Sequence, residues 1–126
     1  LKIWMYPEGT RTRSLDVDML EFKKGAFYMA IQAQVPVVPV VMSCYKHMYS
    51  TETKTFNKVT VTLIGLPPFE TKGLTEDDIP SLIDKVRSSM LSTYLPTVPM
   101  EIKHTKNINS LMHDKQNGNK IKEHEQ

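Results

Sequence analysis

Apolar positions in the first third of the chain form short runs separated by polar, turn-forming stretches. The run over residues 3–6 predicts a strand, and the polar stretch over 7–24, which contains proline and glycine, predicts a long loop. Apolar residues at helical spacing over 25–34 predict a helix, and the β-branched run over 35–42 predicts a strand buried on both faces. This order of elements predicts an α/β fold with an anion pocket at the carboxyl end of a sheet.

Two features modify this pattern of strands. Pro36 and Pro39 cannot donate to a β-ladder, so the strand over 35–42 must be irregular or lie partly at an edge. Residues 43–57 are polar and predict a loop, whereas the alternation of Val and Thr over 58–64 predicts another strand. The expected sheet is therefore partial and mixed, with helices flanking it.

A second helix is predicted after a turn over 65–73. Its apolar positions form one stripe at helical spacing: Ile79, Leu82, Ile83, Val86, Met90, Leu91 and Tyr94. Thr75 and the acidic residues that follow it are candidates for the N-terminal cap. Because Pro80 is tolerated only in the first turn of a helix, the start is expected near Asp77 or Asp78.

The packed part of the chain is expected to end near residue 95. Pro96 and Pro99 follow the second helix, and the polar composition from Met100 onward predicts a disordered tail over 96–126. The chain has 126 residues, enough for one modest domain. Because its first residues already read as a strand, we expect residues 1–95 to be the C-terminal part of a longer domain.

Overall composition excludes some kinds of function. The net charge of +2 is too small to indicate nucleic-acid binding, and we expect no nucleic-acid partner. Cys44 is the single cysteine, so no intrachain disulfide can form, and its place after a buried strand predicts a small apolar filler. No apolar run approaches the roughly 18 residues that a membrane span needs.

Candidate chemistry begins with two cations at a helix start. Lys23 and Lys24 directly precede Gly25, where the helix dipole disfavours positive charge, so a bound anion would explain them. Arg11 and Arg13 offer planar, bidentate donors that suit a phosphate. Spacing alone supports equally well a plain surface loop with solvated lysines.

The loop also contains Glu8 and Gly9. The Glu8 carboxylate can anchor an arginine or bind a substrate hydroxyl, and in the plain-loop interpretation it forms an ion pair with Arg11. Gly9 permits a backbone conformation or a close approach that a side chain would prevent.

Four ordered blocks of the chain resemble one enzyme family. Residues 6–11, Tyr-Pro-Glu-Gly-Thr-Arg, resemble the Phe-Pro-Glu-Gly-Thr-Arg block of the glycerolipid acyltransferases, with one aromatic residue replacing another. Residues 22–27, 30–33 and 35–43 match the same family in order and spacing, and its lysophosphatidic acid acyltransferases in particular. The resemblance covers about residues 1–95.

This resemblance implies a reaction and a set of site residues. The family transfers an acyl group from acyl-CoA to lysophosphatidic acid, giving phosphatidic acid, with acyl-CoA as a co-substrate and no cofactor. It implies that Glu8, Gly9, Thr10 and Arg11 bind the glycerol-phosphate part of the acceptor. Lys23 and Lys24 are added as substrate-binding candidates from the helix-start argument alone.

The resemblance further implies that Val35 to Val41 support the core of the site, with Pro39 the position most often implicated. It implies a parent enzyme that works at a membrane surface, that of the endoplasmic reticulum. Glycerol-3-phosphate or another lysophospholipid remains open as the acceptor, although the match over residues 32–43 favours lysophosphatidic acid.

The catalytic base of that family is absent from this sequence. The family's base is a histidine in an Asn-His-x-x-x-x-Asp motif, which lies before the Glu-Gly-Thr-Arg block. His47 and Glu52 have the same separation but follow the proline-valine run and lack the preceding Asn, so a loop histidine is favoured. We therefore expect no catalytic residue in this chain. The alternatives are a non-catalytic anion-binding module and an inactive truncation product on the same scaffold.

Overall fold

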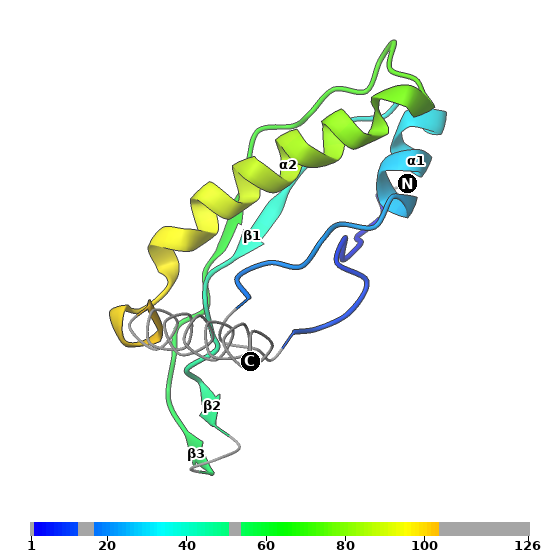
Figure 1. Cartoon of the computed structure of the whole chain (residues 1–126). Coiled ribbons are helices and arrows are strands. Elements are labelled where there is room, and N and C mark those ends of the chain that lie inside the picture. The colour runs from blue at the N-terminus through cyan, green and yellow to red at the C-terminus, as the bar shows by residue number, and fades with distance from the viewer. Residues whose placement is uncertain (1, 13–16, 51–53, 104–126) are drawn as a thin grey trace, which may run out of the picture.

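A computed structural model describes residues 2–12, 17–50 and 54–103. Its elements, in chain order, are α1 (Gly25–Ala33), β1 (Val40–Met42), β2 (Tyr49–Ser50), β3 (Thr55–Phe56), β4 (Leu63–Gly65), the 3-10 turn η1 (Glu76–Asp78), α2 (Ile79–Tyr94) and the 3-10 turn η2 (Leu95–Thr97). The long helix α2 runs along the β1–β4 pair, with α1 near its beginning and the β2–β3 hairpin beyond its far end (Figure 1). The predicted α/β class is confirmed.

The first helix, α1, forms where the apolar spacing predicted it. Its residues Phe27, Ala30 and Ile31 are buried against the core. The helix ends at Gln34, whose φ of 52° lies in the left-handed region. The Gln34 side chain stabilises this end, because its amide donates to the Leu74 carbonyl at 3.2 Å and its carbonyl accepts from the Gly73 amide at 2.7 Å.

The strand predicted over 35–42 is short and open on one side. Regular pairing is confined to β1, which is antiparallel to β4, with Val41 opposite Ile64. Before it, Val37 and Phe69 form an isolated bridge, so the irregularity predicted from the two prolines is confirmed. The prediction that this strand is buried on both faces was wrong, because Val38 is 57% exposed while Val41 is 2% exposed. One face of the pair packs on α2, and the other lacks a cover among the described residues.

The strand predicted over residues 3–6 does not form in the described structure. Ile3 and Tyr6 are 67% and 72% exposed, and the segment has no regular secondary structure. Trp4 and Tyr6 contact each other edge to face, with ring centroids 6.4 Å apart. An apolar run becomes a strand only where a neighbouring strand satisfies its backbone groups, and no described strand pairs with it.

Two further strand predictions need correction. The Val-Thr alternation over 58–64 gives only the three residues of β4, displaced toward the end of the predicted range. The stretch over 43–57, predicted as a loop, contains the antiparallel hairpin β2–β3. Each of its strands has two residues, too few for an alternating pattern to stand out in the sequence.

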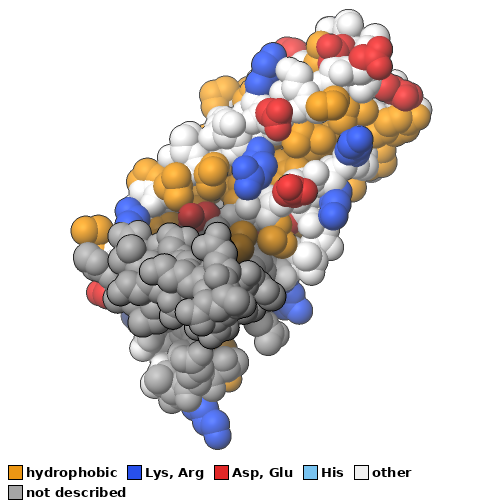
Figure 2. All heavy atoms as spheres, in the orientation of Figure 1, with side chains coloured by type: hydrophobic (Ala, Val, Ile, Leu, Met, Phe, Trp, Pro, Cys, Tyr) orange, Lys and Arg blue, Asp and Glu red, His pale blue; other side chains and the backbone are white. Residues whose placement is uncertain are grey.

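Helix α2 confirms the predicted stripe and start. Thr75 and Asp78 form a capping box, in which the Asp78 carboxylate accepts from the Thr75 amide at 2.8 Å. The acidic residues of η1 lie beside this start, where acidic side chains gather at the upper end of the molecule in Figure 2. The buried positions of the helix are Ile79, Leu82, Val86, Met90 and Tyr94.

The hydrophobic core extends beyond the expected boundary at residue 95. Val98 and Ile102 are 4% and 7% exposed and belong to the same cluster as the α2 stripe. Cys44 is buried in this cluster, as expected of an apolar filler, and its amide donates to the Thr97 hydroxyl at 3.0 Å. The predicted disorder of the tail falls mainly on residues 104–126, which lie outside the described residues.

Tyr94 gives the core a pH dependence that can be measured. Burial, and then a hydrogen bond with the Cys44 thiol, raises the pKa of the Tyr94 hydroxyl. The folded state therefore favours the neutral phenol, so this stabilisation is complete below pH 10 and is lost as the pH rises toward the folded pKa. Above pH 10 we expect the unfolding free energy of the parent chain to fall by about 1.4 kcal/mol per pH unit through this group, and we expect Tyr94→Phe to abolish that contribution.

Urea unfolding of the parent chain and Tyr94→Phe at several pH values from 9 upward checks this expectation. Tyr49→Phe, at a position that is 54% exposed, is the matched control and should keep the parent's pH dependence. Equal slopes for the parent and Tyr94→Phe would contradict the assignment.

Candidate functional site

The block Glu8–Arg11 begins with a tight turn that depends on glycine. The Gly9 amide donates to the Tyr6 carbonyl at 3.1 Å, and Gly9 has a φ of 70°. A Cβ atom at Gly9 would lie 3.3 Å from Cγ of Lys23. Glycine is required here both for the left-handed backbone and for the close approach of the Lys23 stem.

A second contact holds the block beside the start of α1. The Lys23 amide donates to the Pro7 carbonyl at 2.7 Å, across the long loop. One residue before it, Phe22 is buried and its ring stacks on that of Phe27, with centroids 6.2 Å apart. The loop therefore returns to the block at a fixed place, because an aromatic anchor in the core precedes Lys23.

Glu8 holds the loop in place. Its carboxylate Oε2 accepts a hydrogen bond from the Leu20 amide at 2.8 Å. This contact differs from the ion pair with Arg11 that the plain-loop interpretation of the sequence contained. A carboxylate that accepts from a backbone amide is fixed in orientation, so it can also position the residues next to it.

Arg87 on α2 is a positioning residue that sequence reasoning missed. Its guanidinium donates to the Met19 carbonyl at 2.7 Å and to the Leu20 carbonyl at 3.2 Å. A continuous path therefore runs from α2 through the backbone of the loop to the carboxylate of Glu8. The only signal in the sequence is that a cation directly follows Val86 of the buried stripe. Such a cation is common on helices and specifies no partner.

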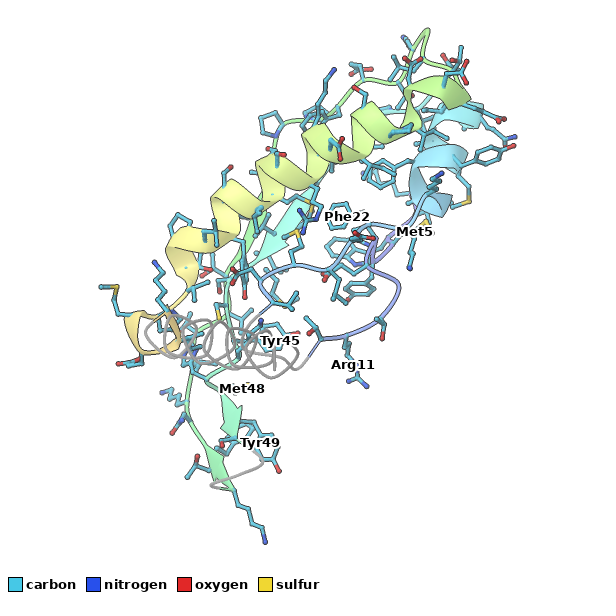
Figure 3. All side chains as sticks on the ribbon, viewed as in Figure 1. Met5, Arg11, Phe22, Tyr45, Met48 and Tyr49 are labelled. Atoms are coloured by element: carbon cyan, nitrogen blue, oxygen red, sulfur yellow. The ribbon has the colours of Figure 1, made fainter. Side chains whose placement is uncertain are left out.

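The cationic candidates lie at the surface around this anchored loop. Thr10, Arg11, Lys23 and Lys24 are all exposed. Lys24 occupies the N-cap position of α1, and the first turn of that helix contains no acidic residue. Figure 3 shows the Arg11 side chain directed outward from the loop. An exposed group of cations at a helix start attracts anions, although a shared ligand for Arg11, Lys23 and Lys24 remains a prediction.

Two other sequence candidates lie elsewhere or outside the described residues. His47 is exposed near the base of the β2–β3 hairpin, and its carbonyl accepts from the Asn57 side chain at 3.0 Å. Its neighbour Met48 is labelled there in Figure 3. Glu52, which would have to orient the His47 imidazole, and Arg13, the second arginine of the loop, lie outside the described residues.

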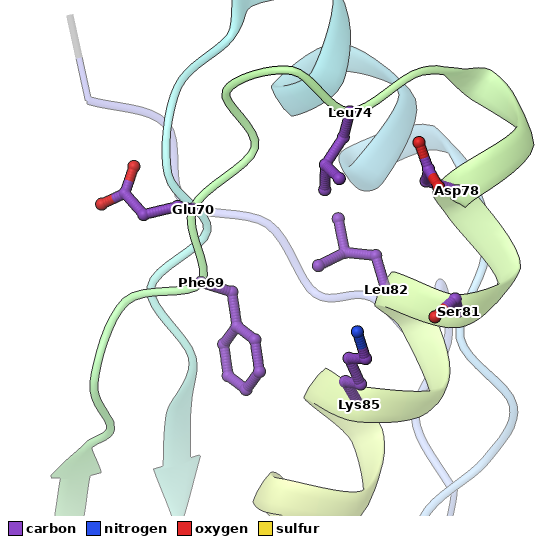
Figure 4. A pocket seen from close by; sticks show the side chains of 7 residues that line it. All are labelled: Phe69, Glu70, Leu74, Asp78, Ser81, Leu82 and Lys85. Carbon is purple, nitrogen blue, oxygen red and sulfur yellow. The ribbon is translucent and has the colours of Figure 1, made fainter.

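A hollow of about 180 Å³ lies between the segment after β4 and the first turns of α2 (Figure 4). Its lining residues are Phe69, Glu70, Leu74, Asp78, Ser81, Leu82 and Lys85. Ligand pockets usually measure about 300–1,000 Å³, so this hollow is too small for a phospholipid or for acyl-CoA. It contains none of the residues of the Glu8–Arg11 block.

The path from α2 to the block predicts an effect of Arg87→Ala. Losing two charge-assisted hydrogen bonds to carbonyls should lower the free energy of unfolding by about 1.5–3 kcal/mol. It should also speed hydrogen exchange at the Leu20 amide, because that amide loses the neighbouring contacts that fix it. Urea unfolding and hydrogen exchange measured by NMR check both effects. Lys85→Ala, an exposed position on the same helix, is the control, and an unchanged Leu20 exchange rate in Arg87→Ala would contradict the prediction.

Comparison with known proteins agrees with the resemblance of the blocks. The family model described as Acyltransferase matches residues 1–43, which include the block, the loop and α1. Human 1-acyl-sn-glycerol-3-phosphate acyltransferase beta is 50% identical over 95 residues, covering 75% of this chain and 34% of the relative. The human alpha enzyme is 47% identical over 94 residues, covering 75% of this chain and 32% of the relative.

A third relative extends into the tail. The 1-acyl-sn-glycerol-3-phosphate acyltransferase of Saccharomyces cerevisiae is 37% identical over 131 residues, covering 95% of this chain and 42% of the relative. No solved structure matches the chain significantly. The chain spans about a third of the length of the two human relatives. The matching blocks and this similarity support the assignment to the acyltransferase family, and the chain is similar to 1-acyl-sn-glycerol-3-phosphate acyltransferases over most of its length.

Proposed function

We propose that this chain forms the acceptor-binding part of an enzyme that acylates 1-acylglycerol-3-phosphate to phosphatidic acid. The acyl donor is acyl-CoA. The free hydroxyl of the acceptor attacks the thioester carbonyl, the carbon–sulfur bond breaks, and CoA leaves as a thiol while the new ester forms. The observation that carries the proposal is 50% identity over 95 residues to a human enzyme whose name gives this acceptor.

The geometry of the block supports an acceptor role. Gly9 brings the backbone of the block against the Lys23 stem, and Glu8 fixes it to the Leu20 amide. Arg11 then presents a planar guanidinium to solvent, where it can bind two oxygens of a phosphate. In this proposal Lys23 and Lys24 add positive charge that neutralises the phosphate, and Thr10 donates from its hydroxyl.

The proton acceptor comes from outside this sequence in this proposal. Acyl transfer to an alcohol needs a base to take the hydroxyl proton, and a histidine oriented by a carboxylate is the usual choice. His47 is exposed at the hairpin and does not belong to the block. We therefore assign the chain to acceptor binding and not to proton transfer.

A chimeric enzyme tests the proposal directly. The region of human 1-acyl-sn-glycerol-3-phosphate acyltransferase beta that matches this chain would be replaced by the corresponding 95 residues. We expect the purified chimera to release CoA from acyl-CoA in the presence of lysophosphatidic acid and to form phosphatidic acid. Glycerol-3-phosphate and lysophosphatidylcholine, tried as acceptors under the same conditions, should react more slowly.

The outcome that contradicts the proposal is a folded but inactive chimera. Thermal unfolding and gel filtration would establish that the chimera is folded before the activity is compared with that of the human enzyme. A folded chimera that binds lysophosphatidic acid without turnover would favour the alternative, a non-catalytic anion-binding module on the same scaffold.

We place the enzyme at the membrane of the endoplasmic reticulum, where its lipid acceptor would be available. None of the described helices is long and apolar enough to span a bilayer. Fluorescence microscopy of a tagged full-length protein with an endoplasmic-reticulum marker tests this location.

A further inference from the structure

The hairpin β2–β3 exposes aromatic side chains at the end of the molecule opposite α1. Tyr49 and Phe56 are 54% and 74% exposed, and Tyr45, just before the hairpin, is 45% exposed. Figure 1 shows the hairpin extending beyond the end of α2. We call Tyr45, Tyr49, Phe56, Lys54 and Lys58 the aromatic hairpin surface.

The aromatic residues are held in place by regular structure. Tyr49 lies directly opposite Phe56 in the antiparallel pair. At the base, the Asn57 amide donates to the Met48 carbonyl at 2.7 Å, and the Met48 amide donates to the Tyr45 carbonyl at 2.9 Å. Figure 3 labels Tyr45, Met48 and Tyr49 at and just before the β2–β3 hairpin. Tyr49 and Phe56 are therefore exposed from two paired strands.

Among the described residues, the charges around the aromatic pair have one sign, while Glu52, between the two strands in sequence, lies outside the described residues. The described parts of this region, 45–50 and 54–58, contain three lysines and no acidic residue. Lys54 and Lys58 are exposed on either side of Phe56. Lys46 donates to the Val17 carbonyl and so ties the base of the hairpin to the loop before α1.

Aromatic rings flanked by lysines match the chemistry of a membrane interface. Tyrosine and tryptophan are enriched where one end of a side chain is apolar and the other is wet, and lysines extend their ammonium groups to the headgroups. An isolated two-stranded hairpin is only marginally stable in water, so a covered aromatic face would also stabilise it. A protein partner would have to offer an apolar patch together with carboxylates. An anionic bilayer combines an apolar interior with negatively charged headgroups along its whole surface.

We propose that the aromatic hairpin surface docks on an anionic lipid bilayer. Phe56 and Tyr49 enter the interface between headgroups and acyl chains, and Lys54 and Lys58 contact the lipid phosphates. This inference deepens the proposed membrane location by naming the element that makes contact. It requires no acyl transfer, so its test is separate from that of the reaction.

Sedimentation with lipid vesicles tests the proposal on the whole 126-residue chain. We expect binding to phosphatidylcholine vesicles that contain phosphatidylserine, weaker binding without it, and weaker binding at high salt. Lys54→Gln and Lys58→Gln should each weaken binding about fivefold. The double variant Tyr49→Ser/Phe56→Ser should weaken it about tenfold or more, because two apolar anchors are lost.

A matched control and a reporter make the result specific. Tyr28→Ser/Met29→Ser removes two exposed apolar side chains from α1, at the other end of the molecule, and should leave binding unchanged. In a Trp4→Phe background, tryptophan placed by Phe56→Trp should shift its emission to the blue on anionic vesicles and be quenched by brominated lipids. Tryptophan placed by Tyr28→Trp should do neither.

Several outcomes would overturn the proposal. The first is that Tyr49→Ser/Phe56→Ser binds vesicles as strongly as the parent chain. The second is that Tyr28→Ser/Met29→Ser weakens vesicle binding as much as Tyr49→Ser/Phe56→Ser does. The third is that the emission of Phe56→Trp does not shift to the blue. A dimer detected by analytical ultracentrifugation that is lost in Tyr49→Ser/Phe56→Ser, without vesicle binding by the parent, would instead assign the surface to a second copy. Far-UV circular dichroism of each variant checks that the fold is retained, which is expected because the substituted side chains are exposed.

Discussion

The 126-residue chain, expressed by itself, is expected to release no CoA from acyl-CoA in the presence of lysophosphatidic acid. The acceptor hydroxyl has a very low acidity, and without a positioned base this step loses typically about 100- to 10,000-fold in rate. The loss of orientation between hydroxyl and thioester adds to that factor. A thiol reagent that detects free CoA measures the reaction, and the chimera described above is the positive control.

His47→Ala distinguishes the explanations if CoA is nevertheless released. Release that disappears in the variant would make His47 the base and contradict the assignment of the base to another part of the enzyme. Release that persists would show a base elsewhere in this chain. His47 is exposed and contributes only its carbonyl to the Asn57 contact, so the substitution should leave the fold intact.

Arg11→Ala in the chimera is expected to reduce kcat/KM for lysophosphatidic acid about 10- to 100-fold. The substitution removes the planar guanidinium and its charge-assisted hydrogen bond to the phosphate of the acceptor. The KM for acyl-CoA should change little, because the donor does not contact the Glu8–Arg11 block in the proposed arrangement. Steady-state kinetics with both substrates varied separates the two effects.

Arg11→Lys and Lys72→Ala are the controls for that experiment. Arg11→Lys keeps the charge but loses the bidentate geometry, so part of the effect should remain. Lys72 is an exposed cation in the segment after β4, and its replacement should leave both kinetic constants unchanged. Unchanged use of lysophosphatidic acid by Arg11→Ala would remove Arg11 from the acceptor site.

The two helices could be predicted from the sequence because their signals are local. The stripe of α2 depends on the 3.6-residue period, and its start depends on Thr75, Asp78 and Pro80, which lie close together in the sequence. The need for glycine at position 9 could also be anticipated, since glycine, which lacks a Cβ atom, readily adopts the backbone of a tight turn and allows another segment to approach closely. These features require no knowledge of distant parts of the chain.

The strands could not be predicted with the same success, because a strand depends on its partner. Residues 3–6 have the composition of a strand, yet no described strand pairs with them and they remain exposed. Val38 belongs to an equally apolar run, but it lies on the face of the β1–β4 region that α2 does not cover. Composition determines that a segment prefers to be buried, while the neighbouring elements determine whether it is.

By itself, the sequence determined the helices, the glycine turn and the group of cations near α1. Only the tertiary structure decided that Glu8 accepts from the Leu20 amide and that Arg87 holds the same loop from 67 residues away. It alone brought Tyr49 opposite Phe56 on an exposed hairpin. The physical reason is that spacing along a chain encodes local periodicity, whereas hydrogen-bond partners and exposed surfaces depend on how distant segments pack.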